Sequence, residues 1–371
     1  MSARMSTQGD IAVIGAGLVG SALALGLART GARVTLVDAA ADDFHASAAN
    51  FGLVWVQGKG LGAPDYAALS FRAAQTWDGF AADLVQATGI SPAYRRTGGV
   101  RIALDEAELE RTRANLARLH NQPGGAQDTE ILDRDALRAL LPGIGPEAVG
   151  AAYCPHDGHA DPLMTLRALR AMLETRATIV PMQVTRVRPA RAGFVIEGDT
   201  GRIQAERVVL AAGLGNAALG PDLGLHAPVR PQRGQILITE RLPPFLDLAT
   251  HTVRQTADGT VMMGDSKEDA GFDRGTTQAV ARDIAARAVR SFPALARARL
   301  VRSWSGLRVM SPDGLPIYQA SATHPGAYLV TCHSGVTLAS LHAGEVAHAI
   351  ADDTLDARYP EFAPTRFEVA A

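Results

Sequence analysis

Three glycines, Gly15, Gly17 and Gly20, follow the apolar run at residues 11–14 and precede a segment rich in alanine and leucine. In a G-x-G-x-x-G arrangement the first glycine permits a tight turn, the second lets the backbone approach a pyrophosphate, and the third lets the next helix pack on the strand. The phosphates then meet the unsatisfied N–H groups at the helix N-terminus. This spacing favours dinucleotide binding.

A second apolar segment, residues 33–37, ends in Asp38. Asp38 follows Gly20 at close to the spacing of about 20 residues expected for the acid that accepts hydrogen bonds from ribose hydroxyls. The alternative is a glycine-rich helix start that serves packing alone. A strand, a helix, a second strand and a terminal acid follow one another in the expected order and spacing. The sequence therefore favours nucleotide binding over a purely structural role.

The segments after Asp38 favour FAD over NAD. An NAD dehydrogenase continues with alternating strands and helices, whereas residues 44–55 form a loop of small residues. Residues 206–220 and a segment that starts at residue 327 contain two later strands, and the second leads through His-Ser-Gly into a predicted helix. A second helix start suits a long cofactor with a pyrophosphate at one end and a flavin carbonyl at the other.

Arg308 stands between apolar residues and a Pro-Asp-Gly turn, in the segment 305–317. A guanidinium is not deprotonated in proteins, so an inward-facing arginine needs an anion or several acceptors. Its planar fork of donors matches a carboxylate, which predicts the carboxylate of an amino-acid substrate. The alternative is that carbonyl groups of the following turn satisfy Arg308.

Composition limits the function classes. A chain of 371 residues with 47% hydrophobic content is long enough for two domains. Its net charge of −2 argues against nucleic acid and against anionic membranes as partners. The lysines are Lys59 and Lys267 alone, which leaves few candidates for a lysine base or a Schiff base.

The cysteines and the apolar N-terminal region predict a cytoplasmic protein. Cys154 and Cys332 form no metal-type spacing and no disulfide framework, which fits a reducing compartment. Residues 11–27 are apolar but lack a strongly basic segment before them and run into a strand, so we expect neither a signal peptide nor a transmembrane segment.

The predicted fold class is α/β, with a discontinuous Rossmann-like FAD-binding domain and an α+β second domain. The FAD-binding domain is expected to comprise residues 1–90, 145–225 and 300–371. An antiparallel sheet in residues 91–144 and 226–299 would form the substrate domain. Helical spacing predicts helices over 105–120 and 161–176, the second with Asp161 as N-cap and Pro162 in its first position.

The chain resembles the glycine oxidase/D-amino-acid oxidase family of FAD enzymes over nearly its whole length. The matching segments are, in order, residues 14–38, 47–52, 157–162, 208–213, 228–235, 306–317 and 333–339. Residues 254–273 and 332–340 are most similar to the smaller, FAD-carrying beta subunits of heteromeric dehydrogenases that act on opines or D-hydroxyproline, and to the related hydrogen cyanide synthase. The resemblance implies a small amino-acid or opine substrate and a partner subunit that relays electrons.

The resemblance also implies site residues. Arg308 would hold the substrate carboxylate and His333 would tune the flavin or contact substrate, although a capping or core histidine is an open alternative. His251 and Arg254 would line the substrate pocket, against the alternative of solvated strand residues. The residues matched to FAD binding are Gly15, Ala16, Gly17, Leu18, Val19, Gly20, Asp38, Ala39, Ser47, Asn50, Phe51, Gly52, Leu53, Val184, Ala212, Gly213, Gly306, Arg308, His333, Ser334, Gly335, Val336 and Thr337.

The chain departs from better-known family members at several positions. The region where sarcosine oxidases carry a lysine implicated in oxygen activation has Met262 and Met263 before its glycine. No cysteine stands near Arg308, so FAD is expected to bind non-covalently, and residues 245–265 lack the pocket tyrosines of D-amino-acid oxidases. His156 and His159 flank Asp157 in a way that imitates a metal cluster, but the matching family segment leads into a helix, so no metal is predicted.

The sequence therefore predicts an FAD-dependent amino-acid or amine dehydrogenase that transfers a hydride from the Cα–H bond to flavin N5. The imine that results is hydrolysed by water, and the flavin carries the redox chemistry. The chain would be the FAD subunit of a heteromeric dehydrogenase of the opine, D-hydroxyproline or other D-amino-acid type. The alternatives are a free-standing oxidase that produces hydrogen peroxide, an NAD-type dehydrogenase and a non-enzymatic nucleotide-binding module.

Overall fold

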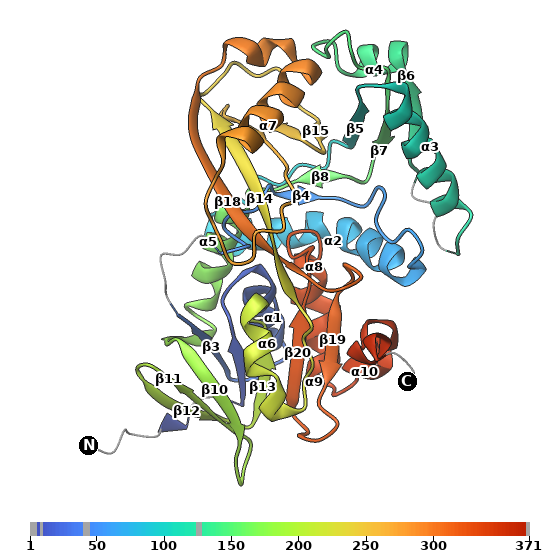
Figure 1. Ribbon diagram of the computed structural model, residues 1–371. Coiled ribbons are helices and arrows are strands. Elements are labelled where there is room, and N and C mark those ends of the chain that lie inside the picture. Colours follow the sequence, from blue (N-terminus) through green and yellow to red (C-terminus); the bar gives the residue numbers. More distant parts are fainter. Residues whose placement is uncertain (1–5, 8–9, 40–44, 124–127, 369–371) are drawn as a thin grey trace.

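A computed structural model describes residues 6–7, 10–39, 45–123 and 128–368 (Figure 1). Residue 44, at the start of the predicted loop 44–55, lies outside this range. Among the described residues, no helix is both long and apolar enough to cross a membrane.

One end of the molecule is built on a six-stranded sheet with the order β19-β20-β13-β2-β3-β9. All neighbours in it are parallel except β19, which is antiparallel to β20. Chain order reverses direction at β2, because β3 lies on one side of it and β13 on the other, and ligands of such sheets bind at this switch point. The strands are β2 (Ile11–Ile14), β3 (Val34–Asp38), β9 (Ala177–Pro181), β13 (Arg207–Leu210), β19 (Ile317–Ala320) and β20 (Ala327–Thr331).

Helices cover one face of this sheet and a smaller sheet covers the other. The helical layer has α1 (Leu18–Arg29), α2 (Pro64–Thr88), α5 (Pro162–Leu173) and a C-terminal helix made of α8 (Ala339–Leu341), a π-turn (His342–Val346) and α9 (Ala347–Ala351), with α10 (Leu355–Arg358) after it. The second layer has β1 (Ser6–Thr7), β10 (Val184–Pro189), β11 (Phe194–Gly198), β12 (Gly201–Ala205) and the short α6 (Asn216–Leu219). Gly26 lets α1 approach the C-terminal helix, since a Cβ there would lie 2.6 Å from the carbonyl oxygen of Ala343.

The other end of the molecule has two four-stranded sheets with a core of their own. One has the order β16-β17-β14-β18, from β14 (Arg230–Thr239), β16 (Val253–Gln255), β17 (Val261–Met263) and β18 (Leu300–Met310). The other has the order β15-β5-β7-β6, from β5 (Gly99–Ala103), β6 (Glu130–Asp133), β7 (Gly150–Cys154) and β15 (Ala249–Thr250). Helices α3 (Glu106–His120), α4 (Arg134–Leu140) and α7 (Gln278–Ser291) pack around them, and a two-stranded ribbon of β4 (Leu53–Val54) and β8 (Gly158–His159) lies between the two ends.

The predicted α/β class is confirmed, and so are the two predicted helices, although the one expected over 161–176 ends at Leu173 and residues 174–176 form a turn. Asp105 caps α3 by accepting a hydrogen bond from the Glu108 amide at 2.8 Å, and Asp161 caps α5. The C-terminal helix was predicted to begin directly after His-Ser-Gly, and this start is wrong. Residues 335–338 form a turn, and the helix begins at Ala339. The domain boundaries stay a prediction, and two strands assigned to the FAD-binding domain pair elsewhere: β7 with β5 and β6, and β18 with β14.

Candidate cofactor and substrate site

The glycine motif forms a tight turn between β2 and α1. Gly15 has φ +104°, and a Cβ on it would lie 2.6 Å from the carbonyl oxygen of Ala211 at the end of β13. A Cβ on Gly20 would overlap the Gly15 carbonyl oxygen. A side chain therefore does not fit at Gly15 or at Gly20. Gly17, the N-cap residue of α1, places no side chain across the helix start.

Asp38 lies beside this turn, as the spacing predicts. Its Oδ2 accepts a hydrogen bond from the Ala16 amide at 2.6 Å. This bond links the turn after β2 to the end of β3. Ser47 also reaches the helix start, where its hydroxyl accepts from the Leu18 amide at 2.9 Å. The first-turn N–H groups of α1 have no acceptors inside the helix, so this turn offers donors to an anion.

The structure brings the C-terminal motif to the same place. A Cβ on Gly335 would lie 3.4 Å from Cγ2 of Val19, and a Cβ on Gly306 would lie 2.6 Å from the Ala49 Cβ. The Thr337 hydroxyl accepts from the Trp55 amide at 3.2 Å. Four segments of the chain thus meet at the switch point of the sheet, and their small residues leave room for a dinucleotide.

Other residues matched to FAD lie around this junction. Val184 is buried on β10 in the same apolar cluster as Val37, the residue before Asp38. Gly213 has φ +59° just after β13, where the Asn216 side chain accepts from the Ala212 amide at 2.8 Å. His333 is exposed and follows β20.

Arg254 supports the loop that carries Asn50, Phe51 and Gly52. Its Nε donates to the Phe51 carbonyl oxygen at 2.5 Å, and burial lowers the pKa of the guanidinium to about 10. A Cβ on Gly52 would lie 2.9 Å from Arg254 Nη2. That Arg254 contacts substrate stays a prediction. In this structure its guanidinium donates to a backbone carbonyl group.

Arg308 projects from β18 toward the segment after β17. Its Nη1 donates to the Ser266 carbonyl oxygen at 2.7 Å, and its Nη2 donates to Asp265 Oδ2 at 2.9 Å. Burial lowers the pKa of Arg308, and Asp265 opposes this shift. A third acceptor is the Arg233 carbonyl oxygen on β14, 3.4 Å from Nη1. The acceptors thus lie outside the turn that follows Arg308, and one of them is a carboxylate that the sequence did not identify.

Asp265→Asn is expected to tighten the binding of an external carboxylate at Arg308 by about two- to fivefold. The two side chains are 21% and 40% exposed, so their ion pair contributes at most about 1 kcal/mol that an incoming carboxylate must displace. Calorimetric titration with butyrate measures the change. Asp269→Asn, which removes an exposed carboxylate 3.6 Å from Arg230, is the control; equal or weaker affinity in Asp265→Asn would contradict competition by Asp265.

Lys59 is a residue that the sequence did not single out. Its Nζ donates to the Ser334 hydroxyl at 2.6 Å and to the Thr337 hydroxyl at 3.1 Å, at the motif matched to the flavin pyrimidine ring. Desolvation lowers its pKa to about 8. Two features of the sequence could have pointed to Lys59: it is one of two lysines, and it closely follows the apolar run 53–56.

Lys59→Met is expected to remove a pH-dependent part of the free energy of unfolding. The folded-state pKa is about 8 and the ordinary value is 10.5, so the unfolded chain binds more protons between these pH values. Wild type therefore gains stability relative to the variant as pH rises from about 8 to 10.5, by at most about 3 kcal/mol. Urea unfolding at pH 7.5 and pH 10 measures the difference in free energy of unfolding between wild type and variant, with Lys267→Met, at an exposed lysine, as the control substitution. A difference in free energy of unfolding that is the same at both pH values would refute the lowered pKa of Lys59.

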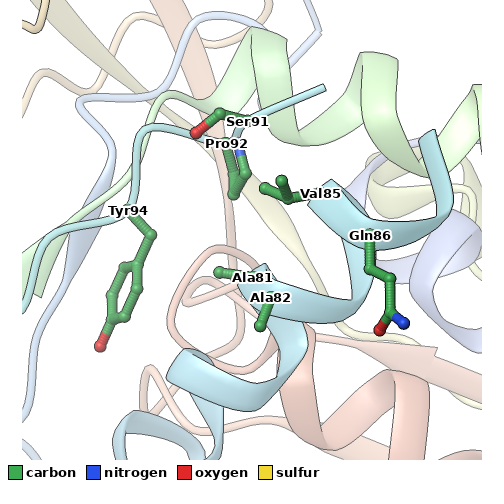
Figure 2. A pocket seen from close by; sticks show the side chains of 7 residues that line it. All are labelled: Ala81, Ala82, Val85, Gln86, Ser91, Pro92 and Tyr94. Carbon is green, nitrogen blue, oxygen red and sulfur yellow. The ribbon is translucent and has the colours of Figure 1, made fainter. Parts of the chain in front are cut away.

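Two hollows lie outside this junction. One, of about 460 Å³, is an open hollow beside α2, where small and apolar side chains prevail and Tyr94 is the sole ionisable residue (Figure 2). It contains none of the predicted site residues. The other, of about 450 Å³, is lined by His251, Arg101, Arg287, Glu108 and Gln57, among others.

His251 thus lies in the wall of this cavity, and its contact with substrate stays a prediction. Its Nδ1 is buried without a partner among the described residues. Burial, together with the charges of Arg101 and Arg287, lowers its pKa far below the ordinary value. Arg287 and Glu108 pair through two hydrogen bonds of 2.8 and 2.9 Å.

Comparison with known proteins identifies a family and several similar chains. The family described as "FAD dependent oxidoreductase" (DAO) matches residues 10–349. An opine oxidase subunit of Agrobacterium tumefaciens is 42% identical over 96% of this chain and 97% of its own length, and the corresponding opine oxidase subunit of Rhizobium meliloti is 39% identical over 97% and 98%. The crystal structure of glycine oxidase from Geobacillus kaustophilus superposes with a TM-score of 0.89 at 23% identity, covering 97% of this chain and 99% of that chain.

Proposed function

Because the chain belongs to the DAO family of FAD-dependent oxidoreductases, we propose that it is the FAD-carrying subunit of a heteromeric dehydrogenase that oxidises a carboxylate-bearing amine. Candidate substrates are opines, D-hydroxyproline or another D-amino acid. The similarity to two proteins named as opine oxidase subunits, over nearly their whole length, supports both the role as one subunit of several and the substrate type.

The residues at the junction fit FAD. The turn at Gly15 and Gly17, the first-turn amides of α1 and the Ser47 hydroxyl would hold the pyrophosphate, and Asp38 would accept from the ribose. Residues 334–337, with Lys59 behind them, would face the pyrimidine ring. When bound, FAD supplies the hydride acceptor.

Arg308 would bind the substrate carboxylate in place of Asp265 and so orient the Cα–H bond. The chain's contribution is then positioning. The amine binds neutral, its lone pair forms the C=N bond as the hydride leaves carbon, and the N–H proton passes to water. Water then hydrolyses the imine to an amine and a carbonyl compound, so no protein base is required.

The observation that carries this proposal is the placement of Arg308 on β18, the strand that also presents Gly306 to the Ala49 loop of the cofactor junction. The test is the visible spectrum of the FAD-loaded chain without air, before and after addition of opines, D-amino acids, glycine and hydroxyproline. Bleaching of the flavin band supports the proposal. A band that persists with every amine overturns it, and peroxide formation in air without a partner would make the chain a free-standing oxidase.

A further inference from the structure

We propose that the cavity around Arg101 binds a second carboxylate of the substrate, so that the enzyme takes a secondary amine with a carboxylate group on each side of the nitrogen. This inference rests on the proposed function and adds a subsite to it. The cavity lies between β5, α3, α7 and the segment Gln57–Leu61.

Arg101 differs from the other inward-facing arginines in having no partner. Among the described residues, none forms a hydrogen bond or ion pair with it. By contrast, Arg233 pairs with Glu268 and Asp273, and Arg287 pairs with Glu108. Burial lowers the pKa of Arg101, and the carboxylates of Asp157 and Asp265 oppose this only at longer range. Arg101 is half-buried, and a guanidinium that is partly withdrawn from water and lacks an anion is suited to receive one.

The rest of the lining does not cancel this charge. Glu108 is the acidic residue of the lining, and its two oxygens are engaged by Arg287. Thr129 and Gln57 contribute polar groups, and the latter is fixed by a 2.7 Å hydrogen bond from its Nε2 to Asp157. The net charge of the lining is therefore positive, and an anion is the ligand it favours.

The cavity is linked to the site at Arg308 on two sides. Asp265, which is hydrogen-bonded to Arg308, is also close enough to act electrostatically on Arg101. The segment 55–61 connects Trp55, whose amide bonds Thr337, with Gln57 and Gly58 in the cavity wall. A Cβ on Gly58 would lie 4.0 Å from Arg101 Nη2. In the proposed complex, one substrate molecule would present a carboxylate to each arginine.

The cavity volume limits the size of the substrate group that links the amine nitrogen to the second carboxylate. About 450 Å³ exceeds what a single carboxylate occupies and lies within the range of small-molecule sites. Because the amine nitrogen must stay near the cofactor while the second carboxylate reaches Arg101, the chemistry that fits is an N-(carboxyalkyl) amino acid.

The test compares N-(carboxyalkyl)glycines, with one to four methylene groups before the second carboxylate, with N-alkylglycines of equal length. Rates of flavin bleaching without air, measured over a range of concentrations on the FAD-loaded protein, give an apparent Kd for each. We expect at least one dicarboxylate to bind at least tenfold more tightly than its match. Arg101→Gln should remove this preference and Arg101→Lys should keep part of it. Arg118→Gln, an exposed change on α3 outside the cavity, should keep all of it.

Equal affinity within every pair, or a preference that survives Arg101→Gln, overturns the subsite and leaves the proposed function standing. If no amine bleaches the flavin, the proposed function fails instead. The subsite is then tested alone with glutarate and butyrate, by flavin difference spectra. A preference for glutarate that depends on Arg101 supports the subsite, and equal binding overturns it.

Discussion

Arg308→Ala is expected to lower kcat/KM for carboxylate-bearing amines by more than about 100-fold. The variant removes two charge-assisted donors, and each hydrogen bond to a charged group contributes about 1.5–3 kcal/mol. Competition from Asp265 reduces the loss by at most about 1 kcal/mol, since that ion pair is partly exposed. A net loss of about 3 kcal/mol corresponds to the stated factor.

The measurement is kcat/KM from steady-state rates with an artificial electron acceptor, together with the flavin content of each variant. Arg308→Lys keeps the charge without the planar fork and should lose less. The double variant Arg308→Ala/Asp265→Asn shows whether the Asp265 carboxylate, left without its partner, repels substrate. Unchanged kcat/KM in Arg308→Ala would overturn the carboxylate assignment, because the guanidinium would then serve only its partners within the protein, Asp265, Ser266 and Arg233.

Gly20→Ala is expected to abolish FAD binding and to lower the free energy of unfolding by about 3 kcal/mol. The new Cβ would overlap the Gly15 carbonyl oxygen, so α1 must move away from the turn. The helix lies in the main apolar core, where Leu18 and Leu23 are fully or almost fully buried, and a shift there disturbs packing on several sides. The same shift separates the first-turn amides from the pyrophosphate.

Flavin content after purification and urea unfolding measure both effects. Gly79→Ala is the matched control: it adds the same methyl group inside α2, where the Cβ meets no atom outside the local helix backbone within 4 Å. That change should stabilise the protein by about 0.5–1 kcal/mol through helix propensity and leave the flavin in place. Normal flavin content in Gly20→Ala would show that the turn tolerates displacement.

The cofactor turn could be predicted because its determinants are close in sequence. The glycine spacing and the acid after the second strand each act within one β-α-β unit, and the structure places Gly15, Gly20 and Asp38 together. The caps of α3 and α5 follow from a few adjacent residues in the same way.

The partners of the charged residues could not be predicted in this way. Asp265 meets Arg308 because the register of β14 on β18 and β17 places the two segments side by side, and no local pattern encodes that register. Lys59 meets Ser334 through a contact between residues 275 positions apart. Arg101 lacks a hydrogen-bond or ion-pair partner among the described residues because the fold places the carboxylates of Asp157 and Asp265 at longer range, and no local pattern encodes those distances.

The six-stranded sheet has a consequence for biosynthesis. Its strand β13 is hydrogen-bonded to β2, near the beginning of the chain, and to β20, near the end. Translation must therefore deliver almost the whole polypeptide before the nucleotide pocket closes, and until then the edge of β13 stays uncovered. Long-range pairing of this kind slows folding and exposes nascent protein to aggregation. Insertion of the flavin is thus a post-translational event, and production in cells should depend on chaperones and on the supply of FAD.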